Sequence, residues 1–146
     1  MHRLRGIAAV SGIYDASVGV MMLLGRPLLS RLFDVPLPQP PIHADLNGIF
    51  LLAVATGYLI PFRDPDRGRA YLWVMGPLLK GGGALAFVLD HLMRHSPRSF
   101  LLFAASDGAL AAITLWALLR DRHHDVEPKA EGFSSASTST QADRPR

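Results

Sequence analysis

The chain has 146 residues, which suits one domain, and its 15 Lys and Arg residues slightly outnumber 12 Asp and Glu residues. The excess positive charge comes from arginines that flank apolar segments, a placement that favours anionic lipid head groups, and the absence of a base-reading motif argues against a nucleic-acid partner. There is no cysteine, so disulfides, thiolate catalysis and cysteine metal sites are excluded.

The first apolar segment covers about residues 5–25, and beyond Arg5 its only charge is Asp15. A basic start before an apolar run is also typical of a signal peptide. Because Asp15 interrupts the run and no clear small-x-small cleavage site follows it, we expect a retained first span. Pro27–Phe33 then predicts a short interfacial helix, with proline in a helix-starting position and an apolar face.

A proline-rich loop is expected next, over Asp34–Ile42, because proline removes backbone donors and is excluded from helix interiors. Asp45 or Asn47 is expected to cap the helix that follows. That helix forms the second apolar segment, over about residues 45–62. A tight charged turn follows, in which Asp64-Pro65 and Gly68 supply the turn chemistry.

The third apolar segment covers about residues 69–91, and Lys80 is the lone charge near its centre. An ammonium at mid-bilayer costs about 2.5–3.5 kcal/mol on insertion scales unless another group answers it. Gly81–Gly83 either let this helix break, as in transporter sites, or allow close helix packing, and we favour close packing. The order Lys-Gly-Gly-Gly does not match a phosphate-binding loop.

The fourth apolar segment covers about residues 99–120, with Asp107 as its only charge before Arg120. Residues 123–146 are rich in Ser, Thr and Ala and predict a polar, disordered cytoplasmic tail. A soluble bundle would show a polar face on each helix, whereas these segments are apolar nearly all round. The predicted fold class is therefore all-α, an integral membrane four-helix bundle over residues 1–122.

Flanking arginines predict the orientation of this bundle. Seven lie on the side of the N-terminus and four on the opposite side, which predicts a multi-pass inner-membrane protein with both termini in the cytoplasm. The larger group contains Arg3, Arg5, Arg63, Arg67, Arg69, Arg120 and Arg122, and the smaller contains Arg26, Arg31, Arg94 and Arg98.

The charged residues Asp15, Lys80 and Asp107 fall at similar depth in three spans, so we expect them to turn inward and form an intramembrane charge cluster. Small residues lie beside each of them and allow the helices to approach closely. A hydrogen-bonded network is expected to extend the cluster through Tyr14, Ser11, Thr56, Tyr58 and Ser106. The cluster is either a structural device that fixes helix register, which we favour, or a proton or substrate site.

No metal site is expected, although His91 and His95 stand at i, i+4 spacing and are weak candidates for sharing an ion. No Ser-His-Asp arrangement or HExxH motif is present, so an enzyme of those kinds lacks support.

Five features of the chain resemble small uncharacterised bacterial four-span inner-membrane proteins that are DoxX-like in appearance. These features are Gly12-Ile13-Tyr14-Asp15, the proline-rich first loop, Asp64-Pro65, Lys80 with its following glycines, and Asp107. The resemblance covers about residues 5–119 and implies four helices in a bacterial inner membrane. It implies no established activity and no catalytic residues.

Three functions remain open at this point. The favoured one is a non-enzymatic accessory or interaction bundle in the lipid bilayer, with a second copy or another membrane protein as its partner and no cofactor. The alternative is a small proton-coupled transporter or permeation subunit that uses the charge cluster. The third is a redox or quinone-linked subunit in which Trp73, Tyr14, Tyr58 and the paired histidines border a cofactor.

Overall fold

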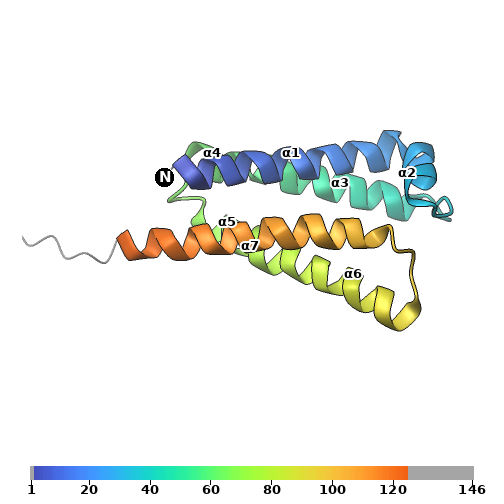
Figure 1. The fold of residues 1–146 in the computed structure, drawn as a ribbon. Coiled ribbons are helices and arrows are strands. Elements are labelled where there is room, and N and C mark those ends of the chain that lie inside the picture. Colours follow the sequence, from blue (N-terminus) through green and yellow to red (C-terminus); the bar gives the residue numbers. More distant parts are fainter. Residues whose placement is uncertain (1, 125–146) are drawn as a thin grey trace, which may run out of the picture.

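The computed structural model describes residues 2–124, and every regular element in this part of the chain is a helix, as the sequence predicts (Figure 1). Residues 125–146, which hold nearly all of the expected tail, lie outside the described residues. The helices are α1 (His2–Leu24), α2 (Arg26–Phe33), α3 (Ile42–Gly57), α4 (Leu59–Arg63), α5 (Arg69–Trp73), the π-helix η1 (Val74–Lys80), α6 (Gly81–Arg94) and α7 (Phe100–His124).

Within residues 2–124, four helical stretches are long and apolar enough to cross a membrane. α1 and α7 supply the first and last, α3 and α4 together supply the second, and α5, η1 and α6 together supply the third. The third stretch continues to Arg94, beyond the expected end near residue 91. Many large apolar side chains on the outer faces are exposed, which is typical of helices that contact lipid.

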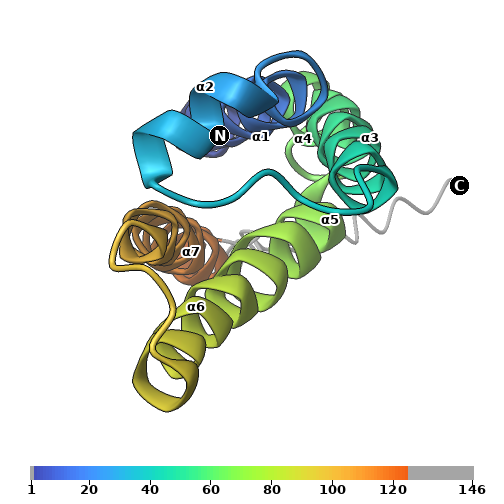
Figure 2. The same ribbon diagram turned by 90° about the vertical axis from the view of Figure 1, so that its right-hand side faces the viewer.

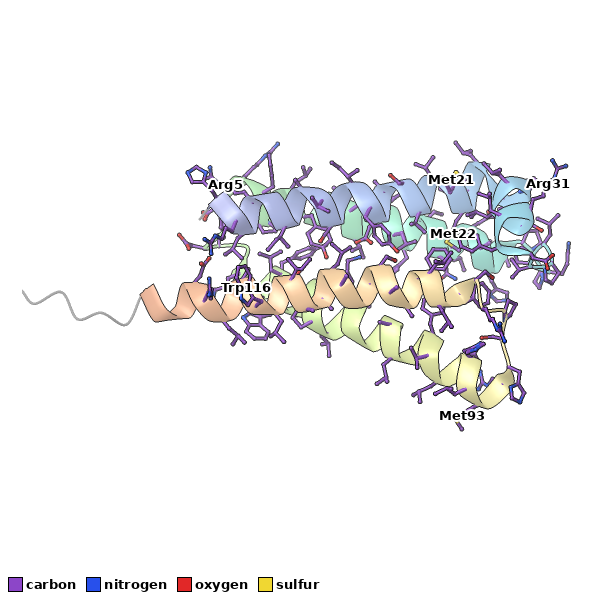
Figure 3. The ribbon with its side chains drawn as sticks, in the orientation of Figure 1. Arg5, Met21, Met22, Arg31, Met93 and Trp116 are labelled. Atoms are coloured by element: carbon purple, nitrogen blue, oxygen red, sulfur yellow. The ribbon has the colours of Figure 1, made fainter. Side chains whose placement is uncertain are left out.

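The stretches run antiparallel, so that the N-terminus, the turn between α4 and α5 and the far end of α7 gather at one end (Figure 1). Arg5 marks this end and Arg31 on α2 marks the other (Figure 3). At the first end the Arg5 guanidinium donates to the Arg63 carbonyl at 3.4 Å. At the second, the Ser99 hydroxyl donates to the Phe33 carbonyl at 2.6 Å, which joins α2 to the start of α7.

Helix α2 has proline in its first turn, as expected, but the expected cap of α3 is wrong. α3 begins at Ile42 and its N-cap position is Pro41, whose fixed φ near −65° suits a helix start. Asp45 therefore lies within the first turn, and Asn47 lies further inside the helix. The Asp45 carboxylate instead pairs with Arg26 at 3.2 Å, which ties α3 to α2.

The turn between α4 and α5 follows the prediction. The Asp64 carboxylate accepts from the backbone N–H groups of Asp66 at 3.2 Å and Arg67 at 3.1 Å, an arrangement typical of aspartate in turns. Gly68 lies against the backbone of Pro61, and an added Cβ there would clash with it. The turn therefore depends on glycine at this position.

The third stretch departs from regular α-helix before the glycine triplet Gly81–Gly83 and not within it. Pro77 lies inside η1, and because proline has no N–H to bond the preceding turn, the helix widens into a π-helix over Val74–Lys80. Gly81–Gly83 continue as regular α-helix. An added Cβ at Gly82 would meet nothing within 4 Å, whereas at Gly81 and Gly83 it would make ordinary van der Waals contact with Ala111 and Asp107 of α7. The triplet therefore packs on α7 through two of its glycines, at a distance that does not require glycine.

Close packing occurs instead at glycines elsewhere. An added Cβ at Gly19 would lie 2.9 Å from the Gly48 carbonyl, where α1 and α3 cross. One at Gly76 would lie 2.5 Å from the Thr114 methyl group, where η1 meets α7. The absence of side chains at these glycines lets the backbones approach, the usual packing device between membrane helices.

The bundle is tight at the N-terminal end and open at the other. A buried cluster fills the tight end with Leu4, Ala8, Val54, Tyr58, Leu72, Ala117 and Leu118. The third stretch crosses obliquely, and α6 moves away from α1 and α3 as it approaches the loop to α7 (Figures 1 and 2). None of its residues is buried, so α6 lies on the outside of the bundle.

Candidate functional site

The three charged residues that were predicted to form a cluster lie together. Lys80, at the end of η1, places its Nζ 2.5 Å from Asp15 Oδ1 on α1 and 3.6 Å from Asp107 Oδ1 on α7. The Lys80 and Asp15 side chains are only 5% and 3% exposed, whereas Asp107 is 19% exposed. The cluster thus joins three of the four stretches, and its two carboxylates are unequal.

Small buried residues flank Asp15 on α1 and Lys80 on η1. Ser11, Asp15 and Gly19 are the buried residues of the middle of α1 and recur every four positions, so they face inward together. On the third stretch Gly76 and Lys80 are the buried residues of η1 at the same spacing. Gly76 and Lys80 are thus buried together, and the Lys80 side chain meets Asp15 of α1.

Tyr14 forms the second part of the site. Its ring centroid lies 4.8 Å from Lys80 Nζ, which is the geometry of a cation–π contact. Its hydroxyl lies 2.7 Å from the Ser106 hydroxyl, a hydrogen bond that links α1 to α7. Ser106 also donates to the Phe103 carbonyl within its own helix. The predicted contribution of Tyr14 and Ser106 to the network is therefore present in the structure.

The other predicted members of the network, Ser11, Tyr58 and Thr56, differ in burial. Ser11 and Tyr58 are buried, as expected, but the Tyr58 hydroxyl has no hydrogen-bond partner among the described residues, so its expected bond in the network is absent there. Thr56 is exposed and donates to the Leu52 carbonyl of its own helix at 2.8 Å, so its place in the network is wrong. Val54 and Tyr58 face the core, and Thr56, two positions from each of them, lies on the opposite side of the helix.

The charges in the cluster do not balance. Two carboxylates and one ammonium sum to −1 when all are ionised. Asp15 Oδ2 and Asp107 Oδ1 are buried and accept no hydrogen bond from any described residue. An unanswered charge in an apolar environment is costly, and Asp107 is the more exposed of the two carboxylates.

The paired histidines do not form a metal site with a third ligand among the described residues. His91 Nδ1 lies 2.7 Å from the Ser96 carbonyl, and His95 terminates α6 in the left-handed conformation with φ 56°. Because His95 lies past the last helical residue, the regular i, i+4 alignment that would have let both rings share an ion is lost.

The residues suggested for a redox cofactor are separated. Trp73 packs against the apolar core of the tight end, whereas His91 belongs to the open end of the same stretch. At about 1.5 Å rise per residue the two lie on the order of 25 Å apart along the helix. They do not border one cofactor site.

One group of interactions was not predicted from the sequence. The guanidinium carbons of Arg3 and Arg120 lie 5.6 Å and 4.7 Å from the centroid of the Trp116 ring on α7, in cation–π contacts. Trp116 lies toward the N-terminal end of the bundle (Figure 3). The i, i+4 spacing of Trp116 and Arg120 was a usable signal, since such residues are neighbours on a helix. The contact of Arg3 is tertiary and had no sequence signal.

Comparison of the chain with protein-family models, with curated proteins and with solved structures finds no match. Membership of a DoxX-like family therefore stays a prediction from the motifs quoted above.

Proposed function

We propose that the chain is a multi-pass inner-membrane protein without enzymatic activity, an accessory bundle whose spans are held in register by Asp15, Lys80 and Asp107. The observation that carries this proposal is the approach of Lys80 Nζ to Asp15 Oδ1 at 2.5 Å with both side chains almost fully buried. A paired and buried ammonium stabilises one arrangement of the helices, because any other register leaves it unpaired in an apolar environment.

The distribution of arginine supports an orientation with both termini in the cytoplasm. The end that holds the N-terminus and the turn between α4 and α5 carries Arg3, Arg5, Arg63, Arg67, Arg69 and Arg120 among the described residues. Anionic lipids of the cytoplasmic leaflet attract such a group. The Trp116 ring between two guanidinium groups is typical of the interfacial belt.

The second candidate function is a proton-coupled permeation subunit, and one observation favours it. Asp107 is less tightly paired than Asp15, retains partial exposure and belongs to a cluster with one carboxylate in excess. A carboxylate of this kind can take up and release a proton while Asp15 keeps Lys80 in place.

Proton flux separates the two functions. Purified protein is reconstituted in liposomes loaded with a pH-sensitive dye, and a pH gradient is applied with and without a panel of small ions and amphiphiles. The accessory role predicts no flux above empty liposomes. Flux that disappears in Asp107→Asn, but not in the control Asp90→Asn, whose carboxylate is already paired with Arg94 at 3.1 Å, would replace it with the transport role.

A further inference from the structure

The open end of the bundle contains a groove along α6 and the start of α7. Its volume is about 500 Å³, and it is lined by residues of α6 from Gly83 to Arg94 and by Phe100 of α7. The two helices diverge there toward the loop that joins them (Figure 1), and Met93 projects from the outer end of α6 (Figure 3). A volume of this size is typical of a small-molecule site.

The inner end of this groove lies next to the charge cluster, with Gly83 as the lining residue nearest to Asp107, which does not itself line the groove. Gly83 lines the groove, and an added Cβ at Gly83 would stand 3.8 Å from Asp107 Oδ2. Asp107 is also the exposed member of the cluster, at 19% against 3% for Asp15. A molecule that fills the groove can therefore place a polar group next to Asp107 without displacing Lys80 from Asp15.

The chemistry of the groove identifies the polar group as a cation. With all three groups ionised the cluster carries one negative charge in excess, and its loosely paired carboxylate lies next to Gly83 at the inner end. Phe87 and Phe100, with ring centroids 6.0 Å apart, belong to the groove lining, and aromatic faces attract cations. Asp90 and Arg94 at the outer end neutralise each other at 3.1 Å, so they add no net charge.

We propose that this groove binds a lipophilic amine, a molecule with an alkyl or aryl body and one protonated amino group. The apolar body lies along α6, and the ammonium donates to the Asp107 carboxylate and balances the cluster. Such a ligand enters from the hydrocarbon region, because the exposed outer face of α6 leaves the groove open to the side. This assignment goes beyond the accessory role, which requires no ligand.

Two adjacent glycines provide the test and its matched control. In Gly83→Leu the new side chain starts at a lining residue of the groove and is directed toward Asp107 Oδ2, so we expect it to separate the groove from this carboxylate. In Gly82→Leu the same side chain points into open space, since nothing lies within 4 Å of an added Cβ there. Both substitutions remove one helical glycine from the same turn, so a general effect on α6 changes both variants alike.

Binding is measured by native mass spectrometry of the full chain released from detergent, after incubation with octylamine, octanol or octanoate. We expect octylamine adducts on the wild type at concentrations about tenfold lower than octanol requires, since the charge-assisted bond to Asp107 is absent with the alcohol. Gly82→Leu should retain this preference and Gly83→Leu should lose it. Asp107→Asn should bind the amine and the alcohol equally.

Several outcomes would overturn the proposal. One is equal binding of octylamine and octanol by the wild type, which removes the role of charge. A second is retention of octylamine by Gly83→Leu at the wild-type level, which places the amine elsewhere. A third is the exclusive appearance of phospholipid adducts or of dimers without amine, which assigns the groove to a lipid or to a second copy of the chain.

Discussion

Lys80 and Asp15 lie 65 positions apart in the chain, yet their ammonium and carboxylate groups meet at 2.5 Å in the interior of the bundle. The second carboxylate, Asp107 Oδ1, lies 3.6 Å from the same ammonium, and its side chain is partly exposed. The two acidic residues therefore have different consequences when they are removed, although both stand at mid-span in the sequence.

Asp15→Asn is expected to destabilise the bundle far more than Asp107→Asn. Removing the close partner leaves a buried ammonium poorly compensated, at a cost of about 3–5 kcal/mol, whereas removing the loosely held partner costs about 1 kcal/mol or less. The measurement is the free energy of unfolding in mixed micelles titrated with a denaturing detergent. Equal losses for the two variants would contradict the unequal pairing.

Gly76→Ala and Gly82→Ala are expected to have opposite effects. The first places a Cβ 2.5 Å from the Thr114 methyl group and must push η1 away from α7, so the melting temperature should fall. The second adds a methyl group in open space and removes a helical glycine, which should stabilise by up to about 1 kcal/mol. Thermal unfolding in detergent checks both, and a stabilising Gly76→Ala would show that the two helices do not touch there.

Tyr14 combines two interactions that substitution can separate. Tyr14→Phe keeps the ring over Lys80 and loses only the hydrogen bond to Ser106, so it should cost about 0.6 kcal/mol, and at most about 1.7. Tyr14→Leu also loses the ring face and should cost more. The same unfolding titration distinguishes the variants. A loss in Tyr14→Phe as large as in Tyr14→Leu would mean that the cation–π contact contributes nothing.

The orientation is open to a clean labelling test, because the chain contains no cysteine. Asp66→Cys places a thiol in the turn between α4 and α5, and Gln39→Cys places one in the loop between α2 and α3 at the opposite end. In intact cells a membrane-impermeant maleimide should label only Gln39→Cys. Labelling of Asp66→Cys before lysis would reverse the proposed orientation.

The positions of the spans and of their charges could be predicted, because length and apolar character are properties of local sequence. The meeting of Asp15, Lys80 and Asp107 followed from one energetic requirement, that charges in an apolar environment find each other. Thr56 was misplaced because its outward phase depends on how α3 rotates against α1. By contrast, the π-helix over Val74–Lys80 and the start of α3 at Ile42 have local causes, Pro77 and Pro41, that were not used in the prediction.

The groove along α6 had no sequence signal. The residues that line it read as an ordinary apolar helix, and only the divergence of α6 from α7 separates their surfaces. The different pairing of Asp15 and Asp107 also had no sequence signal. It depends on the tertiary position of Lys80, whose ammonium lies closer to the Asp15 carboxylate than to the Asp107 carboxylate.

The unfolding free energy of Lys80→Met, measured alone and in the Asp15→Asn/Asp107→Asn background, tests the central claim most directly. Alone, the substitution leaves two facing carboxylates without a cation, and we expect the protein to lose folding and accumulation in the membrane. With all three charges removed, folding should return to the wild-type level or above it, since an apolar replacement of a buried ion cluster is often neutral or stabilising. Lys80→Met that alone folds and assembles like the wild type would contradict the account.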